Sequence, residues 1–125
     1  AVFVGGSEGR IMKSTDLGET WQPTGGGLPT GKKSNVTVLA VSPRQPDRVF
    51  AGVSGGGLFL SENGGASWSP IPTFSGGEDI VDLEFLPGNP DTILALTRRE
   101  VLISSDAGAT WTGLSVPPGA SFTAI

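Results

Sequence analysis

The sequence predicts an all-β fold made of repeated antiparallel units, and three observations indicate it. Twenty glycines and ten prolines among 125 residues supply turns at short intervals. Hydrophobic residues make up 37% of the chain, and those rich in β-propensity, Val, Ile, Leu and Phe, fall in short runs between these turns. A polar segment that ends in tryptophan occurs three times, as STDLGETW, SENGGASW and SSDAGATW. A chain of this length is expected to form one compact domain of short strands.

The repeat extends well beyond the tryptophan-terminated segments. Trp21, Trp68 and Trp111 lie 47 and 43 residues apart, a spacing typical of arrays of supersecondary units. Upstream of the first two, VFVGGSEGRIMKS aligns without a gap on VFAGVSGGGLFLS, and ILALTRREVLIS follows with one residue deleted. A further match joins SPRQPDRVFA to LPGNPDTILA. Whole supersecondary units are therefore repeated.

Each unit is expected to form four strands. In the second copy they are VTVLAVS, RVFAGV, GLFLSE and SWSPIP, and in the third they are IVDLEFL, TILALT, EVLISS and TWTGLS. A meander of this kind carries apolar side chains on both faces, so it must stack on neighbouring meanders. Such stacking is the arrangement of blades in a β-propeller.

The strands amount to three four-stranded antiparallel blades. The predicted segments are strands two to four of a first blade at 1–25, whole blades at 35–72 and 79–116, and the first strand of a further blade at 121–125. Because propellers close with about four to eight blades, we expect either an arc of a propeller with six to eight blades or half of an oligomeric propeller. Further blades are therefore expected partners, in the same chain or from a second copy in a homodimer.

The tryptophan-terminated segments resemble the Asp-box, or BNR repeat, S-x-D-x-G-x-T-W, of one superfamily of β-propellers. In that family the motif lies on the turn between the third and fourth strands of a blade, and the resemblance implies a structural role. The residues expected to form these turns are Ser14, Asp16, Gly18, Thr20, Trp21, Ser61, Asn63, Gly65, Ser67, Trp68, Ser104, Asp106, Gly108, Thr110 and Trp111.

The third copy of the motif illustrates the expected chemistry. The carboxylate of Asp106 is expected to accept hydrogen bonds from its own turn, and Gly108 is expected to adopt a positive φ. Trp111 is expected to fold beneath the loop and seal it against the blade. In the middle copy Asn63 and Ser67 replace Asp and Thr, which predicts a weaker turn that still forms, because an amide oxygen accepts the same bonds without a charge.

Composition excludes several classes of site. Eight basic and twelve acidic residues give a net charge of −4, without the basic footprint of a nucleic-acid-binding protein. The chain has no Cys and no His, so it lacks the residues of a disulfide, a thiolate metal site and the commonest general base. No apolar run is long enough for a membrane span. We therefore expect no metal, no cofactor, no nucleic-acid partner and no membrane-spanning segment.

The sequence offers few candidate residues for contact with a ligand or partner. Lys32 and Lys33 lie in a glycine-rich segment between blades and are candidates for contact with a partner. Phe74 is the one phenylalanine that looks free to meet a ligand, with burial as the open alternative. Asp82 and Glu84 are expected on the same side of a leading strand, where they could face the central channel. No acid occupies the equivalent strand of the preceding blade, so a catalytic role for the pair is not favoured.

The family resemblance points to two classes of function. Sialidases of the superfamily use a tyrosine nucleophile, and this chain has no Tyr. Sortilin-type receptors and photosystem assembly factors are non-enzymatic members, and they favour a protein-interaction or assembly scaffold that binds a protein or peptide and is not an enzyme. The alternative is a carbohydrate-active propeller, either a fragment of a xyloglucanase-like glycoside hydrolase or a glycan-binding module, because SGGGLFLSENGGASW also resembles xyloglucanase blades. Periplasmic, lumenal or secreted localisation is expected in preference to cytoplasmic.

Overall fold

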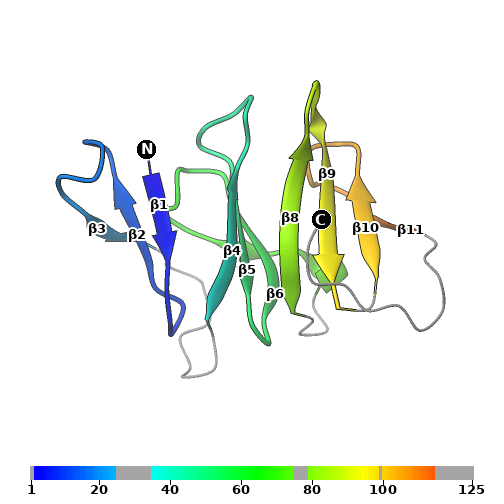
Figure 1. Ribbon diagram of the computed structural model, residues 1–125, viewed down its shortest axis with the longest axis horizontal. Coiled ribbons are helices and arrows are strands. Elements are labelled where there is room, and N and C mark those ends of the chain that lie inside the picture. The colour runs from blue at the N-terminus through cyan, green and yellow to red at the C-terminus, as the bar shows by residue number, and fades with distance from the viewer. Residues whose placement is uncertain (1, 25–34, 75–78, 99, 115–125) are drawn as a thin grey trace.

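The chain forms a row of three antiparallel sheets (Figure 1). The computed structural model describes residues 2–24, 35–74, 79–98 and 100–114. The predicted all-β fold of propeller blades is confirmed within these ranges, and none of the described segments forms a helix long and apolar enough to cross a bilayer. The predicted leading strand at 121–125 lies outside the described residues.

We name the sheets blade 1, blade 2 and blade 3 in chain order. Blade 1 consists of β1 (Val2–Gly5), β2 (Ile11–Ser14) and β3 (Gln22–Thr24). Blade 2 consists of β4 (Val36–Val41), β5 (Val49–Val53), β6 (Gly57–Ser61) and β7 (Ser69–Pro70). Blade 3 consists of β8 (Ile80–Leu86), β9 (Asn89–Thr97), β10 (Val101–Ser104) and β11 (Thr112–Leu114).

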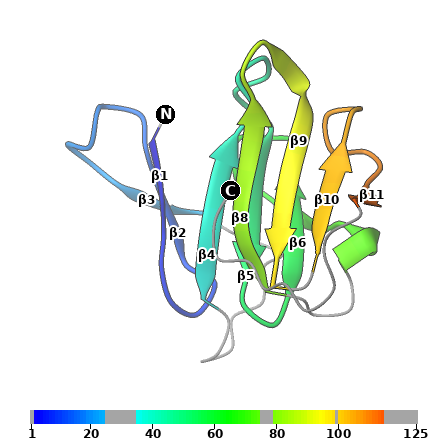
Figure 2. The ribbon, with the colours of Figure 1, turned by 45° about the vertical axis from the view of Figure 1, so that its right-hand side comes forward.

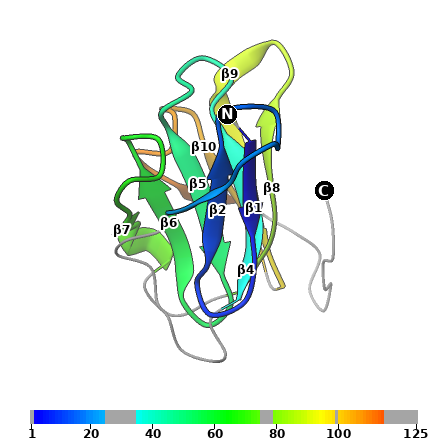
Figure 3. The same cartoon turned by 90° about the vertical axis from the view of Figure 1, so that its left-hand side faces the viewer.

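Each blade is an antiparallel meander whose strands pair in sequence order. The leading strand of each later blade contacts the preceding blade, with β4 against β1 and β8 against β4. In Figure 2 the strands β8, β9 and β10 of blade 3 lie in front of β4, β5 and β6 of blade 2. Figure 3 looks onto the other end of the row, where β1 and β2 are foremost.

The last strand of blade 2 is shorter than the predicted SWSPIP run. Pairing with β6 ends at Phe59↔Pro70, and the chain then enters a 3-10 turn, η1 (Pro72–Phe74). Pro70 and Pro72 have no backbone N–H, which limits ladder formation on this edge strand. One further bond, from the Ile71 N–H to the Leu58 carbonyl at 2.9 Å, holds the segment against β6.

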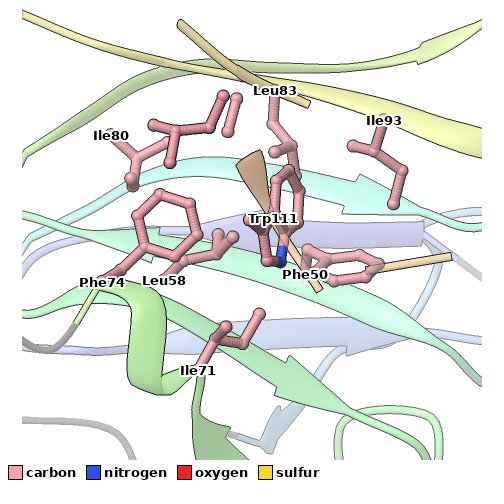
Figure 4. Close-up of a cluster of buried hydrophobic side chains, with 10 residues drawn as sticks. Phe50, Leu58, Ile71, Phe74, Ile80, Leu83, Ile93 and Trp111 are labelled. Atoms are coloured by element: carbon pink, nitrogen blue, oxygen red, sulfur yellow. The ribbon is translucent and has the colours of Figure 1, made fainter. Parts of the chain in front are cut away.

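The core lies between blades because successive residues of a strand point to opposite faces. Along β5, all five residues are buried: Phe50 joins the core between blades 2 and 3, while Val49, Ala51 and Val53 join the core between blades 1 and 2. Figure 4 shows the larger core, where side chains of blades 2 and 3 meet. Its buried members are Phe50, Leu58, Ile71, Phe74, Ile80, Leu83, Ile93, Ala95, Leu102 and Trp111.

Glycine on the second strand of a blade permits close approach of the next blade. A Cβ added to Gly52 would lie 2.9 Å from the Cβ of Ile80, which leads blade 3. Gly5 occupies the same position in blade 1 and faces Val36, which leads blade 2. The hydroxyl of Thr37 adds a link between blades 2 and 3, because it donates to either the Gly52 carbonyl at 3.2 Å or the Ile80 carbonyl at 3.1 Å.

Candidate functional site

The three tryptophan-terminated segments, 14–21, 61–68 and 104–111, form turns that we call the tryptophan turns. In the third, the buried Ser104 hydroxyl donates to Asp106 Oδ1 at 2.8 Å and accepts the Gly108 N–H at 2.8 Å. Thr110 donates its N–H to Asp106 Oδ1 at 2.9 Å and its hydroxyl to Asp106 Oδ2 at 2.5 Å. The Trp111 indole N–H closes the turn on the Gly108 carbonyl at 3.0 Å.

The first tryptophan turn repeats this geometry. Ser14 donates to Asp16 Oδ1 and accepts the Gly18 N–H, both at 2.8 Å, and the Thr20 hydroxyl donates to Asp16 Oδ2 at 2.5 Å. The Trp21 indole N–H donates to the Gly18 carbonyl at 3.1 Å. The two aspartate turns are therefore the same hydrogen-bonded unit.

The middle tryptophan turn keeps the geometry and reverses one hydrogen bond. Asn63 Oδ1 accepts the Ser61 hydroxyl and the Ser67 N–H, both at 2.9 Å. Its amide group then donates to the Ser67 hydroxyl at 2.8 Å, whereas in the aspartate turns the hydroxyl is the donor. Without a carboxylate, none of these bonds carries the strength that a charge adds.

The aspartate turns make stability depend on pH. Hydrogen bonds from the Thr20 hydroxyl and N–H and from Ser14 lower the pKa of Asp16 from 3.8 to about 2, and those from Thr110 and Ser104 do the same to the pKa of Asp106. Because the folded-state pKa lies below the unfolded one, the stabilisation is complete above pH 3.8 and is lost as the pH falls through about 2.

We expect the free energy of unfolding, measured with urea at a series of pH values, to fall between pH 5 and pH 2 with a slope that includes both aspartates. In the double variant Asp16→Asn, Asp106→Asn this part of the slope should disappear, because an amide does not titrate. Asn63→Ala is the matched control: it removes the equivalent side chain from the middle turn and should leave the slope unchanged. Equal slopes in the parent and the double variant would contradict the assignment.

The three tryptophans differ in burial. Trp68 is 5% exposed and Trp111 is 9% exposed, while Trp21 is 38% exposed. Trp111 packs edge-on against Phe74 of blade 2, with ring centroids 5.3 Å apart, and Trp68 joins the core between blades 1 and 2. Each buried indole is thus covered by the preceding blade. The Trp21 indole closes its own turn in the same way, and among the described residues no blade lies before blade 1 to cover it.

In blades 1 and 2 a cation links the blade to the tryptophan turn of the next blade, a contact that we call a cation clamp. Lys13 Nζ lies 5.6 Å from the centroid of the Phe3 ring and donates to the Gly64 carbonyl at 3.0 Å. Arg48 lies 5.9 Å from the centroid of Phe50, and its Nε donates to the Ala107 carbonyl at 3.1 Å. These clamps were not predicted, although Arg48, a basic residue two positions before Phe50, was a visible signal.

Next to Arg48 a groove of 370 Å³ lies between the outer strands of blade 2 and the tryptophan turn of blade 3. Its volume is at the lower end of the range for small-molecule pockets. The ion pair of Arg48 with Glu62, 3.2 Å apart, adds polar groups to a partly apolar lining. The lining residues are Arg48, Leu60, Glu62, Ser67, Ser69, Pro70, Ile71, Pro72, Gly108 and Ala109.

Phe74 is not a ligand-contacting residue. Its side chain is 1% exposed and lies in the core between blades 2 and 3 (Figure 4). The alternative of burial is therefore the correct one, and the 3-10 turn explains it, since η1 directs this residue inward from a segment expected to be an exposed loop. Lys32 and Lys33, the predicted basic contacts, lie outside the described residues.

Asp82 and Glu84 share one face of β8, on the side opposite to the buried Leu83. Their register partners on β9 are Leu96 and Leu94. The strand register therefore places the two acids on one face of the sheet. That they face a central channel stays a prediction. Asp82 Oδ1 accepts the N–H of Leu83 at 2.8 Å.

The positions in blade 2 that are equivalent to Asp82 and Glu84 pack against the next blade. Val38 and Ala40, which precede Leu39 and follow it, pack against the core between blades 2 and 3. The acids thus stand where blade 2 has apolar contacts with its successor. Two carboxylates on that face distinguish blade 3 from blade 2.

Comparison with known proteins agrees with the fold. No family model matches the chain. A xyloglucanase from a Paenibacillus species is 32% identical over 90% of this chain, and a vacuolar protein sorting/targeting protein 10 from Mycosarcoma maydis is 27% identical over 84%. The chain spans only 14% and 7% of the lengths of these relatives.

Solved structures show the same similarity. The chain superposes on an ancestral GH74 enzyme with a TM-score of 0.78 at 24% identity, which covers 98% of this chain and 16% of that one. It superposes on YCF48 bound to D1 peptide with a TM-score of 0.65 at 20% identity, which covers 89% of this chain and 36% of that one. The resemblance to sortilin-type, assembly-factor and xyloglucanase propellers is confirmed at the level of fold.

The expectation of a non-enzymatic protein is corrected by these findings. The relative at 32% identity is named a xyloglucanase, and the structure with the TM-score of 0.78 is a GH74 enzyme. That expectation depended partly on residues absent from this chain, whereas the chain covers a small part of each of these proteins.

Proposed function

We propose that the chain is a propeller segment of a glycoside hydrolase that acts on xyloglucan. The observation that carries the proposal is the match to the Paenibacillus xyloglucanase, because its 32% identity extends over 90% of this chain and thus over all three blades. The similarity in fold supports it without deciding it, since propellers serve both catalysis and binding.

Within this segment, Asp82 and Glu84 are our candidates to contact the polysaccharide. The two residues share one face of β8. Carboxylates accept hydrogen bonds from hydroxyl groups, which a polysaccharide presents in large number.

The experiment is to assay xyloglucan hydrolysis by the protein that carries this chain, by release of reducing ends. We expect activity, and we expect Asp82→Asn and Glu84→Gln each to lower kcat/KM by at least about tenfold, because a hydrogen bond to a charged group contributes about 1.5–3 kcal/mol. Glu62→Gln is the matched control and should leave kcat/KM within about twofold. Full activity in both variants would exclude the pair as substrate contacts, and no hydrolysis of any β-glucan would overturn the proposed function.

Peptide binding is the second candidate function. The likeness to YCF48 bound to D1 peptide favours it, but at 20% identity it supports a shared fold more than a shared ligand. A protein that fails to hydrolyse xyloglucan and instead binds extended peptides would support this candidate.

For the hydrolase we propose export from the cytoplasm, because a polysaccharide is too large to reach an intracellular enzyme.

A further inference from the structure

One face of blade 1 carries exposed apolar side chains. Val2 is 43% exposed, Val4 is 51% exposed and Trp21 is 38% exposed. This face is turned away from blade 2, at the end of the row seen in Figure 3. Large apolar groups that gather in this way mark a contact surface.

The equivalent face of blade 2 is fully buried. Val49 and Ala51, which align with Val2 and Val4, are 0% exposed, and Trp68 is 5% exposed. These side chains are covered by blade 1 in the core between the two blades. In blade 2, therefore, a face of this type is covered by another propeller blade.

The glycine of each covered tryptophan turn receives an aromatic ring from the preceding blade. A Cβ added to Gly65 would lie 3.1 Å from the ring of Phe3, and one added to Gly108 would lie 2.5 Å from the ring of Phe50. The residue before each glycine offers its carbonyl to the cation that lies over the same ring, Lys13 in one case and Arg48 in the other.

In the first tryptophan turn the corresponding glycine and carbonyl belong to Gly18 and Leu17, and neither contacts a ring or cation of a preceding blade among the described residues. Gly18 has a φ of +91°, against +92° and +94° at the other two glycines, and the atom nearest to an added Cβ belongs to its own Trp21. No described residue donates to the Leu17 carbonyl, and the Leu17 side chain is 95% exposed.

We propose that the face formed by Val2, Val4, Trp21 and Gly18 is the seat of another propeller blade of defined chemistry. Its second strand presents a phenylalanine whose ring lies on Gly18. A lysine or arginine lies over that ring and donates to the Leu17 carbonyl.

A second copy of this chain does not supply that chemistry. Blade 3 would be the blade to dock, and its outward face has Leu94 at the position of Phe50, Leu96 at the position of Gly52 and Thr92 at the position of Arg48. The close approach that glycine permits, the aromatic ring and the cation are thus all absent. The occupant is a blade whose sequence differs from that of blade 3, which argues against closure of a ring by a homodimer.

The test extends the full chain with a blade that has the required groups. A copy of residues 36–92 is placed directly before Val2, because Thr92 precedes Ile93 as Ala1 precedes Val2. The copied blade 2 then brings its own phenylalanine, glycine and arginine to the blade 1 face. In a matched extension the copied phenylalanine is replaced by leucine and the copied arginine by threonine, as in blade 3.

The readout is the cost of Gly18→Ala in urea unfolding. In the chain alone we expect about a tenfold change in the unfolding equilibrium constant, from backbone strain only. In the first extension we expect at least a further tenfold change, because the new methyl group meets the ring. In the matched extension the cost should return to its value in the chain alone.

Other outcomes overturn the proposal. They are an equal cost of Gly18→Ala in all three proteins, an extension that does not unfold together with blade 1 in one transition, and a dimer of the unextended chain in sedimentation that Gly18→Ala abolishes. The last outcome would identify a second copy as the occupant. None of these measurements depends on hydrolysis, so the proposed function and this proposal fail independently.

Discussion

Replacement of Phe50 by alanine is expected to destabilise the protein by about 3–5 kcal/mol, the usual cost of removing a buried aromatic side chain. Phe50 is 0% exposed, packs edge-on against Phe85 with ring centroids 6.0 Å apart, and lies beneath the Arg48 guanidinium. Its ring also fills the space over Gly108 of blade 3. The variant therefore leaves a cavity in the interface between blades 2 and 3 and removes the platform of the Arg48 clamp.

The measurement is the midpoint and slope of urea unfolding. Phe3→Ala is the matched control, because Phe3 has the same position in blade 1 but is only partly buried, and it should cost about half as much. Phe50→Leu keeps most of the volume and should cost under about 2 kcal/mol. A cost below 1 kcal/mol for Phe50→Ala would show that this interface contributes little to stability.

Gly108→Ala is expected to cost about 3 kcal/mol. Its φ of +94° strains any residue with a Cβ by about 1–2 kcal/mol. In addition the new methyl group would lie 2.5 Å from Cζ of the buried Phe50 ring, and displacement of such a ring costs roughly 1–3 kcal/mol. The two contributions add because one acts on the backbone and the other on the core.

The other two tryptophan turns provide the controls. Gly18→Ala carries the same strain without a ring to displace, so we expect about 1–2 kcal/mol in the chain alone. Gly65→Ala meets the Phe3 ring at 3.1 Å and should fall between the two. Thermal or urea unfolding of the three variants gives the order directly, and equal costs at the three positions would mean that the interface adapts to the methyl group.

The parts of the fold that depend on nearby residues could be predicted from the sequence. The tryptophan turns were predictable because Ser104, Asp106, Gly108 and Thr110 bond to one another within eight residues. The strands were predictable for the same reason, since each hairpin joins segments adjacent in sequence. The reversed bond at Asn63 was not predicted, although an amide that both donates and accepts permits it.

Features that depend on the neighbouring blade could not be predicted in this way. Phe74 is an example: it was expected either to meet a ligand or to be buried, and it is 1% exposed. The choice between the two is set by its contacts with blade 3, which local patterns do not describe. The face occupied by Asp82 and Glu84 likewise required the register of β8 with β9.

The expectation of a non-enzymatic protein failed for a different reason. The absence of His and Tyr excludes particular catalytic groups from this chain, but a propeller site draws on residues from several blades. A segment that covers 14% of a xyloglucanase can lack those groups while the enzyme has them elsewhere.

The cation clamps have a consequence for how such a protein changes over time. Lys13 lies on β2 and Arg48 lies just before β5, so the same link to a carbonyl of the next blade is built from two different positions of the repeat. Each link joins only adjacent units, as in other repeat proteins with nearest-neighbour stability. Duplication or loss of one blade by recombination therefore affects only the interfaces on its two sides and leaves the other interfaces between blades intact. A clamp at a new interface needs only one basic side chain within reach of an aromatic ring.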